Sequence, residues 1–413
     1  MKTSRRHFLG GFSALAPLNY FSRKASAQEP EINLTPDYYD ELGVEPFINA
    51  IGPYSSLGGA KMWPEVIDAM DYAIKNKARM TDIHDAVGKR IAEMIGAEAA
   101  MVTSGATGAI ILGTAACMTM GDPEKSESLP NTSHMANEVI ILKSQRYLYD
   151  RSIRAPGAKL IEVENTREVS GAINQNTAML FFLLNRPDEI NINVNAYIKT
   201  AKQHGIPIMC DAATTVPPVR KIADTVNLGF DLICYSGGKG LRGPYSAGLL
   251  LGRKDLVEYA RQHGSPNHRA YGRSMKVAAE EYLGMMVAVE KSLQFNEEEE
   301  YQRQLKIVDF MGKNLSRLDG VIVSTKEPNV EAREPYIEID WDEQYEISPT
   351  KVKQLLRNGE PSIEIRALFL SAGKIHLTAT MLEENQAPIV VNRLKEILIQ
   401  SKSKNKNPAI KNT

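Results

Sequence analysis

The sequence predicts an α/β protein: a large domain with a mostly parallel sheet covered by helices, followed by a small C-terminal α+β domain. Over the first 295 residues, short apolar segments typical of buried strands alternate with segments of helical periodicity. Such alternation indicates a parallel sheet with helices on both faces. The pattern changes near Phe295, and 413 residues suit one large domain plus a smaller one.

The elements of the large domain are predicted in chain order. Strands are expected at residues 99–105, 138–142, 158–163, 178–184, 207–212, 231–236 and 247–252. Helices are expected at 66–80, 84–96, 108–121 and 193–205, the last with Gly205 as its C-cap. These helical segments separate several of the strands.

The C-terminal region predicts a long helix over residues 276–318, in which the acidic run Glu297–Glu300 forms the solvated face. Further strands are expected at 321–327, 336–343, 362–370 and 374–380, with helices at 348–359 and 387–400. Residues 401–413 are polar, basic and short on large apolar groups, so a disordered tail is expected there.

Composition excludes several classes of function. The 49 Lys and Arg residues nearly balance 50 Asp and Glu, for a net charge of −1, so the sequence predicts no nucleic-acid partner. Only three cysteines are present, each in or beside an apolar run and without CxxC spacing, and the seven histidines do not cluster. We therefore expect neither a disulfide framework nor a metal site.

The first 27 residues predict an export signal. Arg5-Arg6 followed by Phe8-Leu9 resembles a twin-arginine signal, and Ala25-Ser26-Ala27 is a cleavage-type triplet. The apolar stretch between them is short and interrupted, so no stable membrane anchor is expected. The sequence thus predicts an exported, periplasmic protein that uses the twin-arginine export machinery, which carries proteins already folded around a cofactor.

A lysine in the glycine-rich turn of DLICYSGGKGLRGPYSAGLLLG (231–252) is the first candidate for chemistry. Lys239 follows the predicted strand that ends at Ser236, and ligands of open α/β sheets bind at the carboxyl ends of strands. Asp211 ends another apolar strand, 239 − 211 = 28 residues upstream. By themselves, a solvated surface lysine and a strand-end aspartate would be the simpler interpretations.

A phosphate-binding loop changes that balance. In TSGATGAI (103–110), Ser104, Thr107 and the backbone N–H groups can cradle a phosphate at a helix N-terminus, and the Ser236 hydroxyl could bond the same phosphate. Together with Lys239 and Asp211, these are the parts that pyridoxal 5'-phosphate (PLP) needs.

The chemistry of PLP explains the residue types. A lysine amine attacks the cofactor aldehyde to form a Schiff base, and unlike arginine it can lose its proton when desolvated. The carboxylate of Asp211 would keep the pyridine nitrogen protonated, which makes the ring an electron sink for a carbanion at the substrate Cα. Ala213 is small enough for its neighbourhood to pack flat against the ring.

The order of phosphate loop, aspartate and Ser-x-x-Lys resembles the fold type I PLP enzymes, and more narrowly the branch that contains selenocysteine synthase and D-glucosaminate-6-phosphate ammonia-lyase. The resemblance is carried by FINAIGPYSSLGGAKMWPEV, IGAEAAMVTSGATGAI, YDRSIRAPGAKLIEV, CDAATTVPP, YSGGKGLRGPYSAGLLLGRKDLV and YGRSMKVAAEEYLGMMVAVE, in that order over most of residues 45–290.

The resemblance implies roles for individual residues. Lys239 would be the Schiff-base lysine and proton shuttle, and Asp211 the partner of the pyridine nitrogen. The implied cofactor site also includes Ser104, Gly105, Ala106, Thr107, Ala213, Ser236 and Gln145, the last standing where relatives often carry a histidine near the ring. Members of the branch are dimers or larger rings, so a homodimer or higher homo-oligomer is expected.

Four further residues are candidates for substrate binding. Arg366 would meet a substrate carboxylate, with a salt bridge inside its own sheet as the alternative, and Arg242 is the second choice. Arg273 could equally make a structural ion pair or a subunit contact. Tyr54 could complete a neighbouring subunit's site or simply belong to a turn.

The resulting prediction is an exported PLP enzyme acting at Cα–H of an amino acid or amino-sugar acid. An ammonia-lyase working by β-elimination and deamination is preferred; an aminotransferase, an amino-acid racemase and a catalytically silent binding protein remain alternatives. The absence of basic excess argues against a tRNA-dependent reaction. The expected domains are a signal peptide (1–27), an N-terminal segment (28–60), a large PLP-binding domain (61–295), a small domain (296–400) and a tail (401–413).

Overall fold

The computed structural model describes residues 37–184, 193–216, 220–326, 334–367 and 374–402. The predicted signal peptide and residues 403–413 lie outside these ranges. The described residues fall into two units, the first ending at Pro46 and the second beginning at Phe47. Helix α1 (Tyr38–Glu41) belongs to the first, where the Asp37 carboxylate accepts hydrogen bonds from two backbone N–H groups of its first turn. No helix within the described ranges is both long and apolar enough to cross a membrane.

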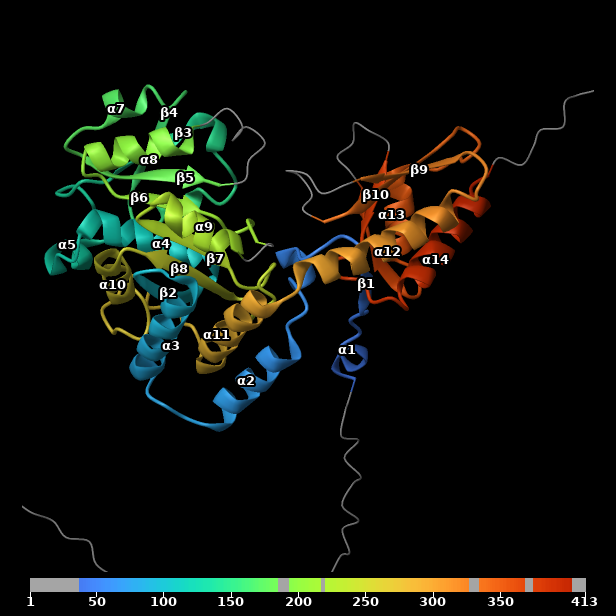
Figure 1. The fold of residues 1–413 in the computed structure, drawn as a ribbon, viewed down its shortest axis with the longest axis horizontal. Helices are drawn as coiled ribbons and strands as arrows, with labels where there is room; N and C mark the ends of the chain where they lie inside the picture. Colours follow the sequence, from blue (N-terminus) through green and yellow to red (C-terminus); the bar gives the residue numbers. More distant parts are fainter. Residues whose placement is uncertain (1–36, 185–192, 217–219, 327–333, 368–373, 403–413) are drawn as a thin grey trace, which may run out of the picture. The chain divides into compact units, whose positions relative to one another are not determined.

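A seven-stranded sheet forms the core of the second unit (Figure 1), with strand order β2-β8-β7-β6-β5-β3-β4. Its strands are β2 (Ala99–Ser104), β3 (Glu138–Leu142), β4 (Lys159–Val163), β5 (Thr177–Leu183), β6 (Ile208–Asp211), β7 (Leu232–Ser236) and β8 (Ala247–Gly252). All neighbours are parallel except β8, which runs antiparallel to both β2 and β7. The predicted α/β fold class is therefore confirmed.

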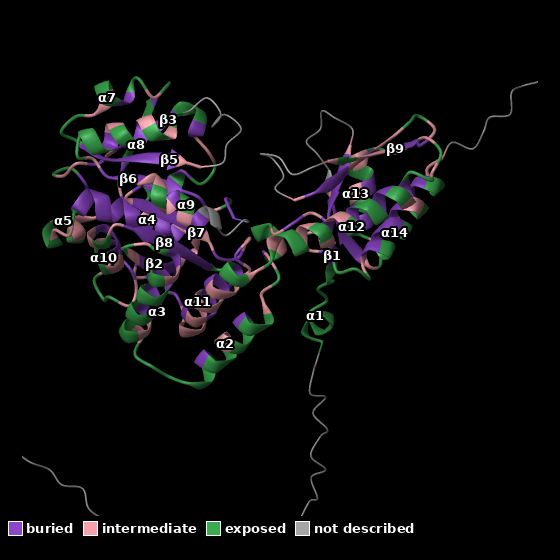
Figure 2. Ribbon diagram, viewed as in Figure 1, coloured by how far each residue is buried: buried purple, intermediate pink, exposed green. Residues whose placement is uncertain are grey.

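Both faces of this sheet are covered, and the burial map shows the sheet within the buried part of the molecule (Figure 2). Along β3, Val139 and Ile141 join one apolar cluster while Ile140 and Leu142 join another, as the period of two requires. The helices of the first cluster are α4 (Gly105–Thr119), α6 (Arg151–Arg154) and α10 (Lys254–Gln262). Those of the second are α3 (Met80–Ile95), α8 (Val194–Gln203), α9 (Arg220–Leu228) and α11 (Ala279–Gln294).

A second sheet and a third apolar cluster are built mostly from the C-terminal residues. Four strands pair in the order β12-β13-β10-β9. They are β9 (Val321–Lys326), β10 (Tyr336–Trp341), β12 (Arg366–Ala367) and β13 (Ile375–Thr378), and β1 (Phe47–Asn49) pairs in parallel with β11 (Ser362–Glu364). Helices α12 (Glu297–Leu315), α13 (Pro349–Arg357) and α14 (Ala387–Gln400) pack in this cluster. The remaining short helices are α2 (Pro64–Lys75), α5 (Pro123–Ser128), α7 (Val169–Ala172) and two 3-10 turns, Ser55–Leu57 and Lys143–Gln145.

Two predicted helices are wrong in their limits. The helix expected over 276–318 is two helices, because α11 ends at Gln294 and the Asn296 side chain caps α12 by accepting from the Glu299 N–H at 3.2 Å. The helix expected over 66–80 ends at Lys75, and Met80 begins α3. Continuous apolar periodicity hid both breaks.

Candidate active site

Three strands bring the predicted site residues to one edge of the seven-stranded sheet. Asp211 ends β6 and lies opposite Cys234 of β7, which ends two residues later at Ser236. Ser104, the last residue of β2, pairs with Ala247, next to the Gly248 that pairs with Ser236. Since β2, β6 and β7 all run in the same direction, their carboxyl ends meet at the same edge, where α/β sheets bind ligands.

The start of α4 leaves hydrogen-bonding groups available at that edge. Gly105 begins the helix at φ +68°, and the first-turn N–H groups of a helix have no intrahelical acceptor. Among the described residues, the hydroxyls of Ser104, Thr107 and Ser236 make no recorded hydrogen bond, and all three residues are half-buried. A phosphate group is the ligand such a set suits best, because it offers acceptors to both the N–H groups and the hydroxyls.

Backbone packing holds this cradle closed. A Cβ on Gly248 would overlap the backbone carbonyl carbon of Gly105 at the start of α4. Only glycine therefore lets β8 approach that helix so closely. In the lysine turn, a Cβ on Gly238 would lie 2.7 Å from the Tyr245 carbonyl oxygen. The Gly238 carbonyl oxygen itself accepts a 2.8 Å hydrogen bond from Ala60, which ties the turn carrying Lys239 to the N-terminal loop.

The Asp211 carboxylate is 4% exposed and is surrounded by uncharged donors. Oδ2 accepts from the Tyr147 hydroxyl at 2.5 Å, and Oδ1 accepts from the Ala213 N–H at 2.9 Å and the Cys234 thiol at 3.6 Å. Among the described residues, no basic side chain forms an ion pair with it. A buried carboxylate is stable only when its charge is compensated, so this environment favours a ligand with a positive group.

The donors around Asp211 stay protonated over the ordinary pH range. Burial, followed by the negative charge of Asp211, raises the pKa of the Tyr147 hydroxyl well above its usual range. The same two causes raise the pKa of the Cys234 thiol. All three cysteines are buried and free, and the position of Cys234 beside Asp211 was not foreseen.

The side chain of Gln145, whose predicted role near the cofactor ring stays a prediction, is hydrogen-bonded to the neighbouring strand. Its side chain is fully buried, its Nε2 donates to the Leu183 carbonyl oxygen at 3.0 Å, and its Oε1 accepts from the Leu183 N–H at 3.0 Å. Both polar atoms therefore extend the end of β5. Tyr147, two residues further on, reaches Asp211 instead, and its position just after a predicted strand was the signal that could have identified it.

The substrate-binding candidates are dispersed. Arg366 lies on β12, opposite His376, and no hydrogen bond or ion pair of its side chain is recorded within the described part of the chain. Its neighbour Glu364 pairs with Arg357 at 3.2 Å. The structure thus places Arg366 in the second sheet, apart from the strands that carry Lys239 and Asp211.

Arg242 lies close to the lysine turn but is held in place. Its guanidinium stacks 3.7 Å from the centre of the Trp63 ring, and its Nε donates to the Lys61 carbonyl oxygen at 2.8 Å. Arg273 donates from Nη1 to the Ser265 hydroxyl at 3.3 Å. Tyr54 is 43% exposed and precedes the 3-10 turn Ser55–Leu57.

Comparisons with known proteins bear on the family and the fold of the chain. The family model described as aminotransferase class-V matches residues 69–275. The chain is 28% identical over 377 residues to a 5'-C-glycyluridine monooxygenase-decarboxylase of Streptomyces sp, covering 87% of this chain and 92% of that one. It is 26% identical over 376 residues to the D-glucosaminate-6-phosphate ammonia lyase of Salmonella typhimurium, covering 88% and 98%. A solved structure of a D-glucosaminate-6-phosphate ammonia-lyase superposes with a TM-score of 0.79 at 25% identity, covering 89% and 99%.

Proposed function

The chain belongs to the aminotransferase class-V family of PLP-dependent enzymes, and on this premise we propose that it acts at Cα–H of an amino acid or amino-sugar acid as an exported ammonia-lyase. One observation carries the proposal. The lysine turn, the buried aspartate and the hydroxyls of the phosphate cradle lie at the carboxyl ends of β7, β6 and β2, which share one edge of the sheet although antiparallel β8 runs between β2 and β7.

The residues fit the cofactor. The start of α4 and the hydroxyls of Ser104, Thr107 and Ser236 would hold its phosphate, and the Lys239 amine would bond to its aldehyde carbon. A protonated ring nitrogen would supply the positive charge that Asp211 lacks among the described residues. When bound, PLP supplies the electron sink that stabilises a carbanion at the substrate Cα.

Side chains of the protein would supply the proton transfers and hold the Asp211 carboxylate in position. The Lys239 amine would be the base that takes the proton from Cα and the acid that returns one to the leaving group or to Cβ. Tyr147, Cys234 and the Ala213 N–H orient the Asp211 carboxylate without neutralising its charge. Asp211 and Cys234 are buried, which strengthens the electrostatic interactions of the carboxylate.

The lyase assignment is preferred over that of the monooxygenase-decarboxylase relative because both a relative over 88% of this chain and a solved structure over 89% of it carry the ammonia-lyase name. An aminotransferase or a racemase would share the same first proton transfer and differ only in the fate of the carbanion. The experiment is a screen of D- and L-amino acids and aldonic amino acids for ammonia, keto acid and inverted product. Ammonia with a keto acid in equal amounts, without an amino acceptor, supports the lyase; inversion alone, or a strict need for an acceptor, rejects it.

A catalytically silent binding protein is the alternative from another class. The presence together of Lys239, Asp211 and the phosphate cradle argues against it, because a scaffold needs none of their chemistry. Reconstitution with PLP separates the two: a visible absorption band that shifts on adding substrate supports an enzyme. A protein that gains no such band would favour the scaffold.

Export is proposed from the Arg5-Arg6 pair and the cleavage-type triplet at 25–27. The expected outcome is a periplasmic, processed protein, and replacing both arginines by lysine should retain it in the cytoplasm. Unchanged export of that variant would reject the twin-arginine route.

We also propose a homodimer or larger homo-oligomer, which sedimentation of the mature protein tests directly.

A further inference from the structure

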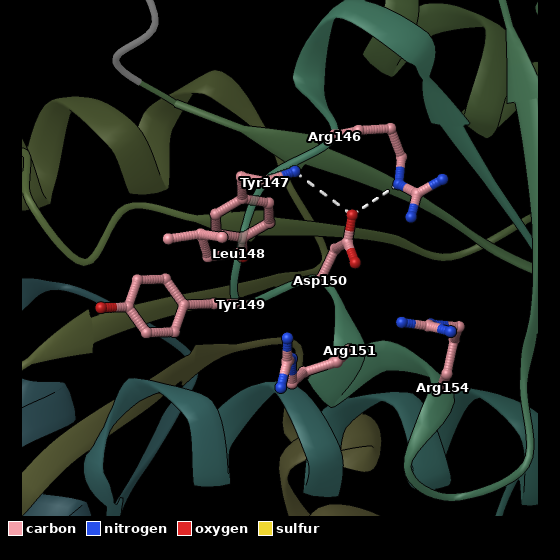
Figure 3. A pocket seen from close by; sticks show the side chains of 7 residues that line it. All are labelled: Arg146, Tyr147, Leu148, Tyr149, Asp150, Arg151 and Arg154. Atoms are coloured by element: carbon pink, nitrogen blue, oxygen red, sulfur yellow. Dashed lines mark hydrogen bonds and ion pairs between the residues drawn. The ribbon is translucent and has the colours of Figure 1, made fainter.

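A groove runs along the segment between β3 and β4, outside the cofactor site described above. It is lined by Arg146, Tyr147, Leu148, Tyr149, Asp150, Arg151 and Arg154. Figure 3 shows Arg151 and Arg154 projecting from α6 into the space below Asp150, with Arg146 on the far side of that carboxylate. Three arginines and one aspartate give the lining a net charge of 3 − 1 = +2.

The three arginines are not equivalent. Arg146 donates from Nε to Asp150 at 2.5 Å and also pairs with Glu162, so its charge is already compensated. Arg151 and Arg154 are exposed, and within the described residues neither has a recorded hydrogen bond or ion pair. They are three residues apart on one helix, a spacing at which like charges face each other and destabilise the helix. An anion between them would remove that repulsion.

The aromatic side chains connect the groove to the active site. Tyr149 is 55% exposed at the groove and packs edge-on against Tyr147, with ring centres 6.0 Å apart. The hydroxyl of Tyr147 in turn donates to Asp211. A ligand in the groove therefore lies one tyrosine side chain away from the carboxylate that would hold the cofactor nitrogen.

We propose that this arginine groove is an anion subsite that binds a carboxylate or phosphate group carried by the substrate in addition to its reacting amino acid portion. The planar guanidinium groups of Arg151 and Arg154 suit such oxyanions because each can donate two parallel hydrogen bonds. As a substrate subsite it rests on the proposed function, whereas binding of an oxyanion by the groove can be measured without any reaction.

The direct test uses the PLP-loaded protein, so that the cofactor's own phosphate fills the cradle at α4. Binding of inorganic phosphate and of acetate is measured by calorimetry at constant ionic strength, with phosphorus NMR as a second readout. In Arg151→Gln/Arg154→Gln the affinity for the better-bound anion should fall at least tenfold. The matched control, Lys313→Gln/Arg317→Gln, removes two exposed charges from the other end of the chain and should bind as the wild type does.

The comparison of the two anions identifies the group: tighter phosphate points to a phosphorylated substrate, and tighter acetate to a dicarboxylic one. With substrates found in the screen, the double variant should raise KM at least tenfold for those bearing the extra anion. It should leave kcat, the cofactor band and KM for neutral amino acids unchanged.

Three outcomes overturn the inference. The first is equal anion affinity in the wild type and the double variant. The second is a uniform rise of KM for neutral and anionic substrates. The third is a double variant that sediments as a smaller species while still binding anions normally, since α6 would then be a subunit contact. A protein that binds anions through the groove but converts no amino acid would reject the proposed function alone.

Discussion

Asp211 combines deep burial with donors that carry no charge, which is the residue-scale feature that most favours a cationic ligand. Asp211→Asn keeps the shape of the side chain and removes the charge that would keep the ring nitrogen protonated. We expect turnover to fall by about 10² to 10³, about 3 to 4 kcal/mol, which is the size of one lost preorganised electrostatic contact. Cofactor affinity should fall much less, because the cradle at α4 is untouched. Near wild-type turnover would remove this residue from the mechanism.

Lys239 should be the residue that bonds to the cofactor. Borohydride reduction of the loaded enzyme is expected to fix PLP to the peptide containing Lys239, which mass spectrometry of a digest identifies. Lys239→Ala should lose essentially all turnover, whereas exposed Lys313→Ala serves as the control that keeps it. Label on a peptide from any other lysine would show that the assignment is wrong.

Sequence reasoning selects Lys239 and Asp211 because a glycine turn and a strand end mark them locally, and their roles stay predictions. It could not separate Gln145 from Tyr147, which lie two residues apart after the same strand. The 3-10 turn at Lys143–Gln145 turns the amide of Gln145 onto the backbone of β5 and leaves Tyr147 to reach Asp211. Which of the two reaches the site depends on a tertiary contact with β5, and no local pattern encodes that contact.

The elements of the sheet were predictable for a physical reason. Strands β3 and β8 begin and end at the predicted residues. Strands β4 and β7 begin one residue late, and β5 and β6 differ by one residue at both ends. The agreement is close because a strand buried on both faces is an uninterrupted apolar run. The break between α11 and α12 was not predictable from periodicity, since apolar residues continue through it. The Asn296 cap fixes the position of the break. A single asparagine inside a helical pattern is common, so its presence does not by itself predict a break.

The contact between β8 and the start of α4 gives a prediction for whole elements. In Gly248→Ala the added methyl group would overlap the backbone of Gly105, so β8 and the start of α4 must move apart. We expect at least a tenfold loss of PLP affinity, measured by spectroscopic titration of the apo-protein. Gly171→Ala in α7 is the matched control, because its Cβ would meet nothing within 4 Å. Equal affinity in both variants would mean that the cradle does not hold the phosphate.

At the scale of the whole molecule, the apolar interior encloses several uncharged histidines. His84 is 2% exposed on α3 and packs against the Tyr282 ring with centres 5.0 Å apart, and neither of its ring nitrogens has a hydrogen-bond partner in the described part of the chain. Burial, aided by the charge of Arg261 and opposed by Asp85, lowers its pKa to about 4. Burial lowers the pKa of His263 to about 4 as well, where Thr119 shares a 2.9 Å hydrogen bond with its ring.

These histidines make the stability of the whole fold sensitive to mild acid. Their folded pKa values lie below the unfolded value of about 6.5, so as pH falls below 6.5 the unfolded chain binds protons that the folded chain does not. Each could remove about 3 kcal/mol by pH 4, since one pKa unit corresponds to about 1.4 kcal/mol. The loss begins before carboxylates with lowered pKa values, such as Glu383, start to contribute near pH 4.5.

The window from pH 6.5 to 4.5 therefore isolates the histidines, and thermal unfolding across it is the measurement. We expect the Tm of the wild type to fall steadily through this window. His84→Phe keeps a ring against Tyr282 and leaves no hydrogen-bond partner unpaired, so a large part of that fall should disappear. The remainder comes from His263 and His376, because burial lowers the pKa of both. His268→Phe, at an exposed position, should leave the slope as it is. A His84→Phe protein that loses as much Tm between pH 6.5 and 4.5 as the wild type would contradict the idea that its neutral, enclosed imidazole links folding to pH.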